Sequence, residues 1–112
     1  MEQQITLSGR VASIGEGLVK GTARIINSES ELDKIQHGDI MITGQTDINF
    51  VPALEICTGL ITEQGGRFCH AAIYSRENGL ACITDVDGAR TTIIDGQLIL
   101  LNTKENKITI AE

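Results

Sequence analysis

The chain has 112 residues, which is enough for one domain with a single modest core and too few for two. Hydrophobic residues make up 41% and aromatic residues only 3%, so Ile, Leu, Val and Ala must fill the core of an ordinary globular protein. The net charge of −6 argues against a nucleic-acid-binding protein, which needs a basic face, and against binding to an anionic membrane surface.

The N-terminus and the cysteines indicate a cytoplasmic protein. No apolar run reaches the length of a membrane span, and residues 1–13 lack the basic and apolar regions of a signal peptide. Cys57, Cys69 and Cys82 are odd in number and form no C-x-x-C pair. This usage is typical of a reducing compartment and suggests neither a disulfide framework nor a zinc site.

The first elements predicted along the chain are a strand and a short helix. Residues 17–27, "GLVKGTARIIN", are typical of a strand after a glycine turn. Residues 28–38 predict a helix, because Ser28 followed by Glu31 is a capping-box pattern and Gly38 can end it.

Two short buried strands follow. Residues 39–43, "DIMIT", predict the first, and "GQTDINFVPALEI" after it predicts a loop with a brief helical turn around Pro52. Residues 57–62, "CTGLIT", predict the second buried strand, which runs into "EQGGRF".

The C-terminal half predicts one helix and several further strands. The helix covers 70–78 and is closed by Gly79, and residues 80–84 form a third short apolar run. Residues 91–110 alternate strands with Asp-Gly and Glu-Asn turns, as hairpins do. The mixture predicts a single compact α/β domain, with a β/β/α arrangement, over residues 1–112.

One of only two histidines lies at the start of the 70–78 helix. On a helical wheel, His70 lines up with Tyr74 on the polar side, so we expect it to be exposed. The opposite, inward-facing side contains the apolar residues Cys69, Ala72, Ile73 and Leu80.

The location of His70 favours anion chemistry. Free backbone N–H groups and the helix dipole attract an anion to a helix N-terminus. Gly65 and Gly66 let the backbone approach a ligand, and Arg67 offers a planar donor that suits phosphate oxygens. A neutral imidazole nitrogen can attack phosphorus at physiological pH, so this pattern suits a phosphohistidine carrier.

Plainer interpretations of the same residues stay open. A glycine-rich turn before a helix is common, and an exposed His70 can simply be a surface residue. Cys69 beside His70 can be interpreted as a thiol nucleophile with its base, but adjacent helical residues point about 100° apart, which favours a buried thiol. His37, at a helix-to-strand turn, is best interpreted as solvated.

The chain has no recognisable nucleotide-binding loop. The glycines of "GEGLVKG" do not fit G-x-G-x-x-G, no G-x-x-x-x-G-K-[ST] is present, and no carboxylate cluster indicates a magnesium site. Phosphoryl transfer depends on metal ions and cationic side chains that neutralise phosphate. We therefore expect the domain to supply a nucleophile and to turn over no substrate alone.

The segment "TEQGGRFCHAAIYSRENGLACI" resembles the signature of the phosphohistidine, or swivelling, domain of PEP-utilizing enzymes, roughly T-E-x-G-G-x-x-S-H-A-A-I-x-A-R-E-x-G-I-P-A-V. That family includes pyruvate phosphate dikinase, PEP synthase, enzyme I and rifampicin phosphotransferase. "LDKIQHGDIMITGQTDINFVPAL" is similar to the family's G-D-[IV]-L-V-T-x-x-T-x-P-x-x-x-P segment, and "IDGQLILLN" to its closing strand. The likeness extends along almost the whole chain.

This resemblance implies the swivelling β/β/α fold and a phosphoryl carrier. His70 would be phosphorylated, on Nε2, with Gly65, Gly66 and Arg67 around the phosphate. The supporting residues carried over from the signature are Thr62, Glu63, Cys69 and Arg76. ATP or PEP, and magnesium, would bind to partner domains or subunits, one binding nucleotide and one binding PEP, pyruvate or another acceptor. The domain itself would bind no cofactor or metal.

The sequence also departs from the family pattern. Cys69 replaces the usual Ser, and Phe68 replaces a Thr, which excludes regulatory threonine phosphorylation at that position. Ile48 and Ala81 replace prolines, and Asp85 stands where the family often has Gly. These changes leave two alternatives to a carrier: a non-catalytic interaction or regulatory module with the same fold, and a thiol enzyme that uses Cys69. Whether the chain is a whole gene product or an excised domain stays open.

Overall fold

The computed structural model describes residues 5–110, which form one mixed sheet with short helices. The sheet order is β1-β8-β7-β3-β4-β5-β6-β2, in which β3 to β6 run parallel and the other pairs are antiparallel. The strands are β1 (Ile5–Leu7), β2 (Arg10–Ser13), β3 (Leu18–Ile26), β4 (Asp39–Thr43), β5 (Gly59–Thr62), β6 (Cys82–Thr84), β7 (Leu98–Asn102) and β8 (Lys107–Ile110). The strands predicted within 17–27, 39–43, 57–62 and 80–84 are thus present.

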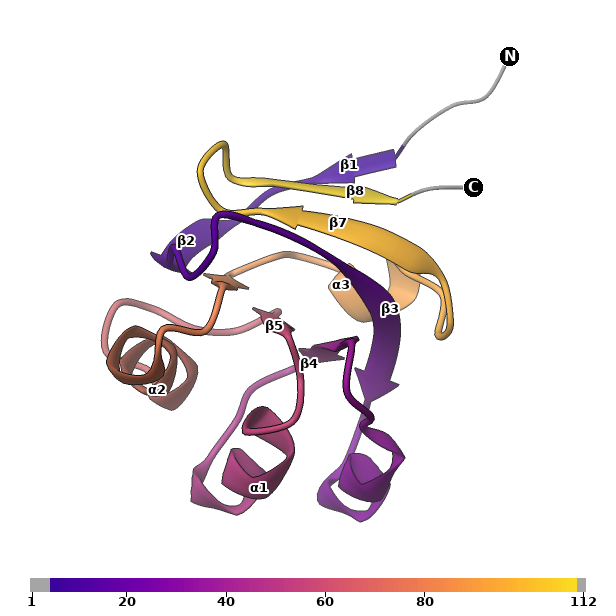
Figure 1. The fold of residues 1–112 in the computed structure, drawn as a ribbon, viewed down its shortest axis with the longest axis vertical. Helices are drawn as coiled ribbons and strands as arrows, with labels where there is room; N and C mark the ends of the chain where they lie inside the picture. The colour runs from indigo at the N-terminus through magenta and orange to yellow at the C-terminus, as the bar shows by residue number, and fades with distance from the viewer. Residues whose placement is uncertain (1–4, 111–112) are drawn as a thin grey trace.

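The sheet curls back on itself. The long curved strand β3 carries β7, β8 and β1 over β4, β5 and β6, as Figure 1 shows. The two ends of the sheet order, β1 and β2, are joined through Ser8 and Gly9. The Asn106 side chain bonds both the N–H of Gly9, at 3.1 Å, and its carbonyl oxygen, at 2.7 Å, and so fastens this link to the β7–β8 turn.

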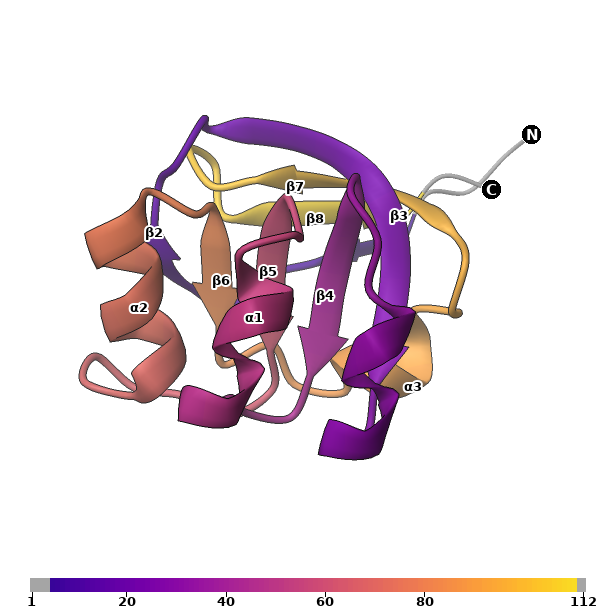
Figure 2. The same ribbon diagram turned by 60° about the horizontal axis from the view of Figure 1, so that its bottom comes forward.

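Short helices cover the outer face of the parallel half: η1 (Glu29–Lys34), η2 (Ile48–Phe50), α1 (Val51–Leu54) and α2 (His70–Asn78). A further helix, α3 (Ala89–Thr92), lies on the opposite, inner face, where Ala89 is buried in the same cluster as Ile42 of β4 and Ile99 of β7. Figure 2 shows η1, α1 and α2 in front of β4, β5 and β6. The molecule therefore has the layers of the predicted β/β/α arrangement: an antiparallel half-sheet, a parallel half-sheet and helices.

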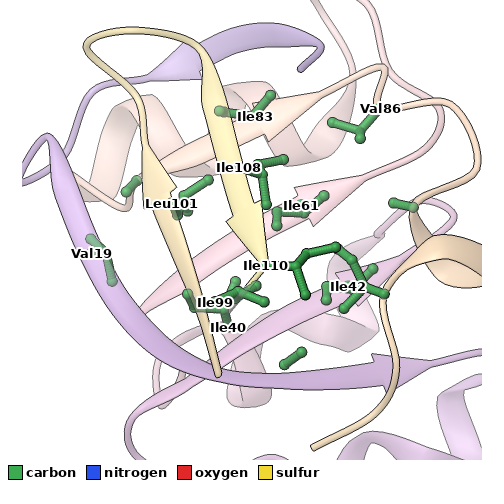
Figure 3. Packing of buried hydrophobic residues seen from close by; sticks show 14 residues of the cluster. Val19, Ile40, Ile42, Ile61, Ile83, Val86, Ile99, Leu101, Ile108 and Ile110 are labelled. Carbon is green, nitrogen blue, oxygen red and sulfur yellow. The ribbon is translucent and has the colours of Figure 1, made fainter. Parts of the chain in front are cut away.

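Two apolar clusters lie between these layers. Alternate residues of a strand point to opposite faces, so Ile40 and Ile42 of β4 pack inward and Met41 packs towards the helices. Figure 3 shows the inner cluster, which includes Val19, Ile40, Ile42, Ile61, Ile83, Val86, Ile99, Leu101, Ile108 and Ile110. Because β4 is covered on both faces, all five of its residues are buried, as the apolar run "DIMIT" predicted.

The helix predicted over 28–38 is wrong in extent and type. It is a single 3₁₀ segment, Glu29–Lys34, because the backbone becomes extended at Ile35. The Ile35 side chain is thereby buried in the outer cluster, which lies between the parallel strands and the helices and includes Met41, Leu54 and Leu60. The predicted capping box is not formed, since neither of its two bonds involves the N-cap residue Ser28 as expected. Glu31 accepts a hydrogen bond from the N–H of Asn27 at 2.6 Å, while the Ser28 hydroxyl bonds Ser30 instead of the backbone.

The strand expected at the start of 91–110 is also wrong, since Thr91 and Thr92 belong to α3. Arg90 explains the difference, because both its backbone N–H and its guanidinium are held by Glu63. The Asp95 turn connects α3 to β7, and its carboxylate accepts the N–H of Ile25 at 2.7 Å. The second expected hairpin, β7 with β8, is present.

Within residues 5–110, no helix is long and apolar enough to cross a membrane.

Candidate functional site

The candidate site lies where the parallel strands end. β4 leads into Gln45 and Thr46, and β5 leads into the glycine loop, residues 63–69, which runs into α2. β6 leads into Asp85. Because neighbouring parallel strands end at the same edge, these three segments meet there, as ligand sites of open α/β sheets do.

Cys69 fixes where α2 begins. Its backbone is extended, and its sulfur accepts the N–H of Ala72 at 3.4 Å, so it is the N-cap. His70 is therefore the first residue of the helix, as predicted, and Gly79 ends the helix in the left-handed conformation with a φ of 68°.

His70 is held by a residue that the sequence analysis missed. Its Nδ1 lies 2.8 Å from the hydroxyl oxygen of Thr46, which is 8% exposed. The ring of Tyr74, one turn along α2, stacks loosely on the imidazole with centroids 6.1 Å apart. His70 is thus half-buried rather than exposed, and it lines a cleft of about 260 Å³ together with Thr46, Gly65 and Cys69.

The inward face of α2 differs from the helical wheel. The buried residues are Ala71, Ala72 and Ser75, and Ile73, expected inside, is 40% exposed. The helix is rotated about its axis relative to the wheel. His70 faces Thr46, in the loop after β4, and the small side chains of Ala71, Ala72 and Ser75 therefore face the sheet.

Gly65 and Gly66 are needed for the shape of the loop. A Cβ on Gly65 would lie 2.7 Å from the Cβ of Thr84, so this loop packs tightly on the end of β6. Gly66 has a φ of +106°, which favours glycine. Its N–H donates to Asp85 at 3.1 Å, so that N–H already has an acceptor within the chain.

Asp85 anchors the glycine loop. One of its carboxylate oxygens accepts hydrogen bonds from the N–H of Gly66 and, at 2.8 Å, from the hydroxyl of Thr84. Its φ is 60°, in the left-handed region that glycine adopts more readily. Asp85 thus keeps a backbone conformation that suits glycine and adds a side chain that ties β6 to the loop.

Glu63 and Thr62 support the loop from below. The Glu63 carboxylate binds Arg90 through two guanidinium bonds of 2.9 and 3.0 Å and one backbone N–H bond of 2.7 Å. The Arg90 hydrogen bonds hold the pKa of Glu63 below its ordinary value. The hydroxyl of Thr62 donates to the carbonyl oxygen of Gln64 at 2.6 Å.

Arg67 and Arg76 lie away from the His70 cleft. An Arg76 guanidinium N–H donates to the carbonyl oxygen of Arg67 at 2.9 Å. Both arginines line a different hollow, together with Arg10 and Gly66. Of the predicted phosphate-binding residues, the structure therefore brings only Gly65 into the cleft with His70, whereas Gly66 and Arg67 line the other hollow.

The cysteines show no arrangement of a thiol enzyme. Burial raises the pKa of Cys57 to about 11 and that of Cys82 to about 12. The Cys69 sulfur caps α2, and His70 directs Nδ1 to Thr46 instead. Over residues 5–110, no group of three or more His, Cys, Asp and Glu side chains is placed to hold a metal ion.

Comparison with known proteins identifies a family. Residues 35–106 match the model of the PEP-utilising enzyme mobile domain. The chain is 40% identical over 100 residues to a probable phosphoenolpyruvate synthase of Methanothermobacter thermautotrophicus, covering 89% of this chain but only 14% of that protein. It therefore spans a small part of the relative that it matches.

Solved structures show the same fold at low identity. Enzyme I superposes with a TM-score of 0.59 and 18% identity, over 70% of this chain and 33% of that one. Aconitase X of Thermococcus kodakaraensis superposes with a TM-score of 0.69 and 12% identity, over 96% of this chain and 99% of that one. The α/β fold expected from the sequence is confirmed.

Proposed function

The chain belongs to the mobile-domain family of PEP-utilising enzymes, and from this membership we propose that it is a phosphoryl carrier in which His70 is the acceptor. The observation that supports this most directly is the 2.8 Å hydrogen bond between His70 Nδ1 and the Thr46 hydroxyl. When Nδ1–H donates to Thr46, the lone pair of the neutral imidazole lies on Nε2. In this proposal the bond holds His70 in the tautomer whose nucleophilic nitrogen is Nε2.

The transfer step follows from this tautomer. Nε2 attacks phosphorus, the N–P bond forms, and the bond from phosphorus to the bridging oxygen of the donor breaks with its electrons left on that oxygen. Nδ1–H keeps its bond to Thr46 while the ring becomes cationic. The reverse step, with an acceptor oxygen attacking phosphorus, regenerates neutral His70.

The donor and acceptor sites belong, in this proposal, to other domains. We expect one to bind ATP or PEP with magnesium and another to bind PEP, pyruvate or a different acceptor. The chain covers only 14% of its synthase relative, which leaves room in such a protein for these domains. The cleft lined by Gly65 and His70 would then receive the phosphoryl group of the donor that is bound to the other domain.

Phosphoramidate, a small chemical donor that phosphorylates imidazole directly, tests the proposal without a partner. The chain provides its own control, because its second histidine, His37, is exposed. We expect intact mass and ³¹P spectra to show faster phosphorylation of His70 than of His37, on Nε2, with loss of that signal in His70→Ala and not in His37→Ala.

Equal or faster modification of His37 would contradict the carrier assignment. It would favour the alternative of a non-catalytic interaction module, in which His70 is only a structural partner of Thr46. If His70 is instead modified first, incubation with the ATP- and PEP-binding domains of the same organism identifies the natural donor.

A further inference from the structure

A second hollow beside α2 has a basic lining. It measures about 260 Å³ and is bounded by Arg10 of β2, by Gly66 and Arg67 of the glycine loop, and by Ala72 and Arg76 of α2. Among the described residues, its lining includes no Asp or Glu. Three of the nine basic residues of a chain with net charge −6 thus gather at one place.

Few carboxylates among residues 5–110 lie close enough to neutralise the charges of these three arginines. Arg10 Nε lies 3.6 Å from a carboxylate oxygen of Asp85, with both side chains about half exposed. Arg76 donates a hydrogen bond to a neutral acceptor, the carbonyl oxygen of Arg67. This bond holds the Arg76 side chain in place but does not neutralise its positive charge. Within the part of the chain that the structure describes, neither Arg67 nor Arg76 has an ion-pair partner. Like charges collected in this way repel one another unless an anion joins them.

We propose that this hollow binds the phosphate group of a small phosphate-bearing anion. Guanidinium forks match phosphate oxygens, and a group with two or more negative charges can neutralise several arginines at once, whereas a single carboxylate brings one charge. The small residues Gly66 and Ala72 leave space for a compact tetrahedral group between the arginine side chains.

The hollow is separate from the cleft of His70. The two cavities share no lining residue. At about 100° per residue, Ala72 and Arg76 lie roughly 200° and 240° around α2 from His70. An anion in the hollow is therefore not the phosphate that His70 would carry, and the inference stands independently of the proposed carrier function.

Pyrophosphate is the probe for the first experiment. We expect its titration into the ¹⁵N-labelled chain to shift the amide signals of Gly66, Arg67 and Ala72. Arg67→Ala should weaken binding roughly fivefold or more, since a charge-assisted hydrogen bond is lost. Lys20→Ala removes the same charge from an exposed position elsewhere and should leave the affinity unchanged.

Further arms separate the ligand classes. Shifts of the same amides by ATP would show that the hollow accepts the phosphate chain of a nucleotide, whereas shifts by pyrophosphate alone would indicate a site for the inorganic anion. His70→Ala should bind as the parent does. The proposal is overturned if these amides do not move, if only Gly65 and His70 respond, if Lys20→Ala weakens binding as much as Arg67→Ala, or if only a polyglutamate peptide binds.

Discussion

In the proposed tautomer, Thr46 accepts a hydrogen bond from Nδ1–H and leaves Nε2 of His70 free. Replacement by Val removes the hydroxyl that lies 2.8 Å from Nδ1 and keeps the shape of the side chain. Both tautomers then become populated, so we expect phosphoramidate to modify Nε2 about tenfold more slowly and Nδ1 to appear as a second product. ³¹P and ¹⁵N spectra of the product distinguish the two nitrogens.

Thr91→Val is the matched control for this change. The Thr91 hydroxyl also makes one hydrogen bond, to the carbonyl oxygen of Gly88, but lies in α3 and does not contact His70. An unchanged ratio of Nε2 to Nδ1 in Thr46→Val would mean that Thr46 does not select the nitrogen.

The sequence led to His70 but not to Thr46. The two residues are 24 positions apart, so no local pattern links them. A signal was nevertheless present, because Thr46 follows a predicted buried strand and the glycine loop follows the next. Parallel neighbours end at one edge, which places such turns together. For Arg67 the sequence contains no such signal. Its position directly after the glycine pair did not show that it lines the hollow beside α2 and not the cleft of His70.

At the level of the helix, Cys69 acts as a cap. Its sulfur accepts the N–H of Ala72, a role that a serine hydroxyl performs better. We expect Cys69→Ser to keep or slightly raise stability, and Cys69→Ala to lower the free energy of unfolding by about 1 kcal/mol. Urea unfolding measures both.

The same pair of variants tests the thiol alternative. If Cys69 were a nucleophile, Cys69→Ser and Cys69→Ala would both abolish activity and native alkylation at this residue would be rapid. We instead expect Cys69→Ser to be phosphorylated on His70 at the parent rate. A loss of phosphorylation in the serine variant, with the helix intact, would show that the thiol does more than cap α2 and would favour the thiol alternative.

The loop after β5 and the helix α3 are coupled through Glu63 and Arg90. The hydrogen bonds from Arg90 lower the folded-state pKa of Glu63 below its ordinary value of 4.5. A depressed carboxyl pKa contributes stability that is present above the unfolded-state value and is lost as the pH falls through the folded-state value. We therefore expect stability to decline below about pH 4.5 and Glu63→Gln to flatten this part of the curve.

Thermal unfolding between pH 3 and pH 7 tests the coupling. Glu105→Gln is the control, because Glu105 is exposed and its ion pair with Lys107 measures 3.9 Å. The same pH slope in parent and Glu63→Gln would show that the pair contributes no pH-dependent stability.

Much of the element pattern could be predicted because each signal was local. "DIMIT" and the Gly79 helix end follow from hydrophobic runs and glycine. The errors arise where a distant contact decides. Arg90 is drawn into α3 by Glu63, which lies 27 residues earlier, and Ile35 ends η1 by entering the outer cluster. The curling of the sheet is likewise set by pairings between strands distant in sequence.

At the scale of the molecule, Asn106 closes the curled sheet. It holds both polar groups of the Gly9 backbone and has a φ of 56°, which Asn tolerates better than most residues. Asn106→Gly removes the two bonds but relieves the backbone, whereas Asn106→Ala removes them and adds strain. We expect losses of about 1–2 kcal/mol for Gly and about 1 kcal/mol more for Ala.

Urea unfolding and amide hydrogen exchange separate this closure from a merely local effect. If Asn106 fastens β1 and β2 to the β7–β8 turn, amides of these four strands should lose more protection than the drop in global stability explains. Amides of β4 and β5, which pair only with β3, β6 and each other, should lose only as much protection as global stability falls. Faster exchange confined to the turn itself would show that the two edges stay joined without Asn106, and that the curl is maintained by the inner apolar cluster alone.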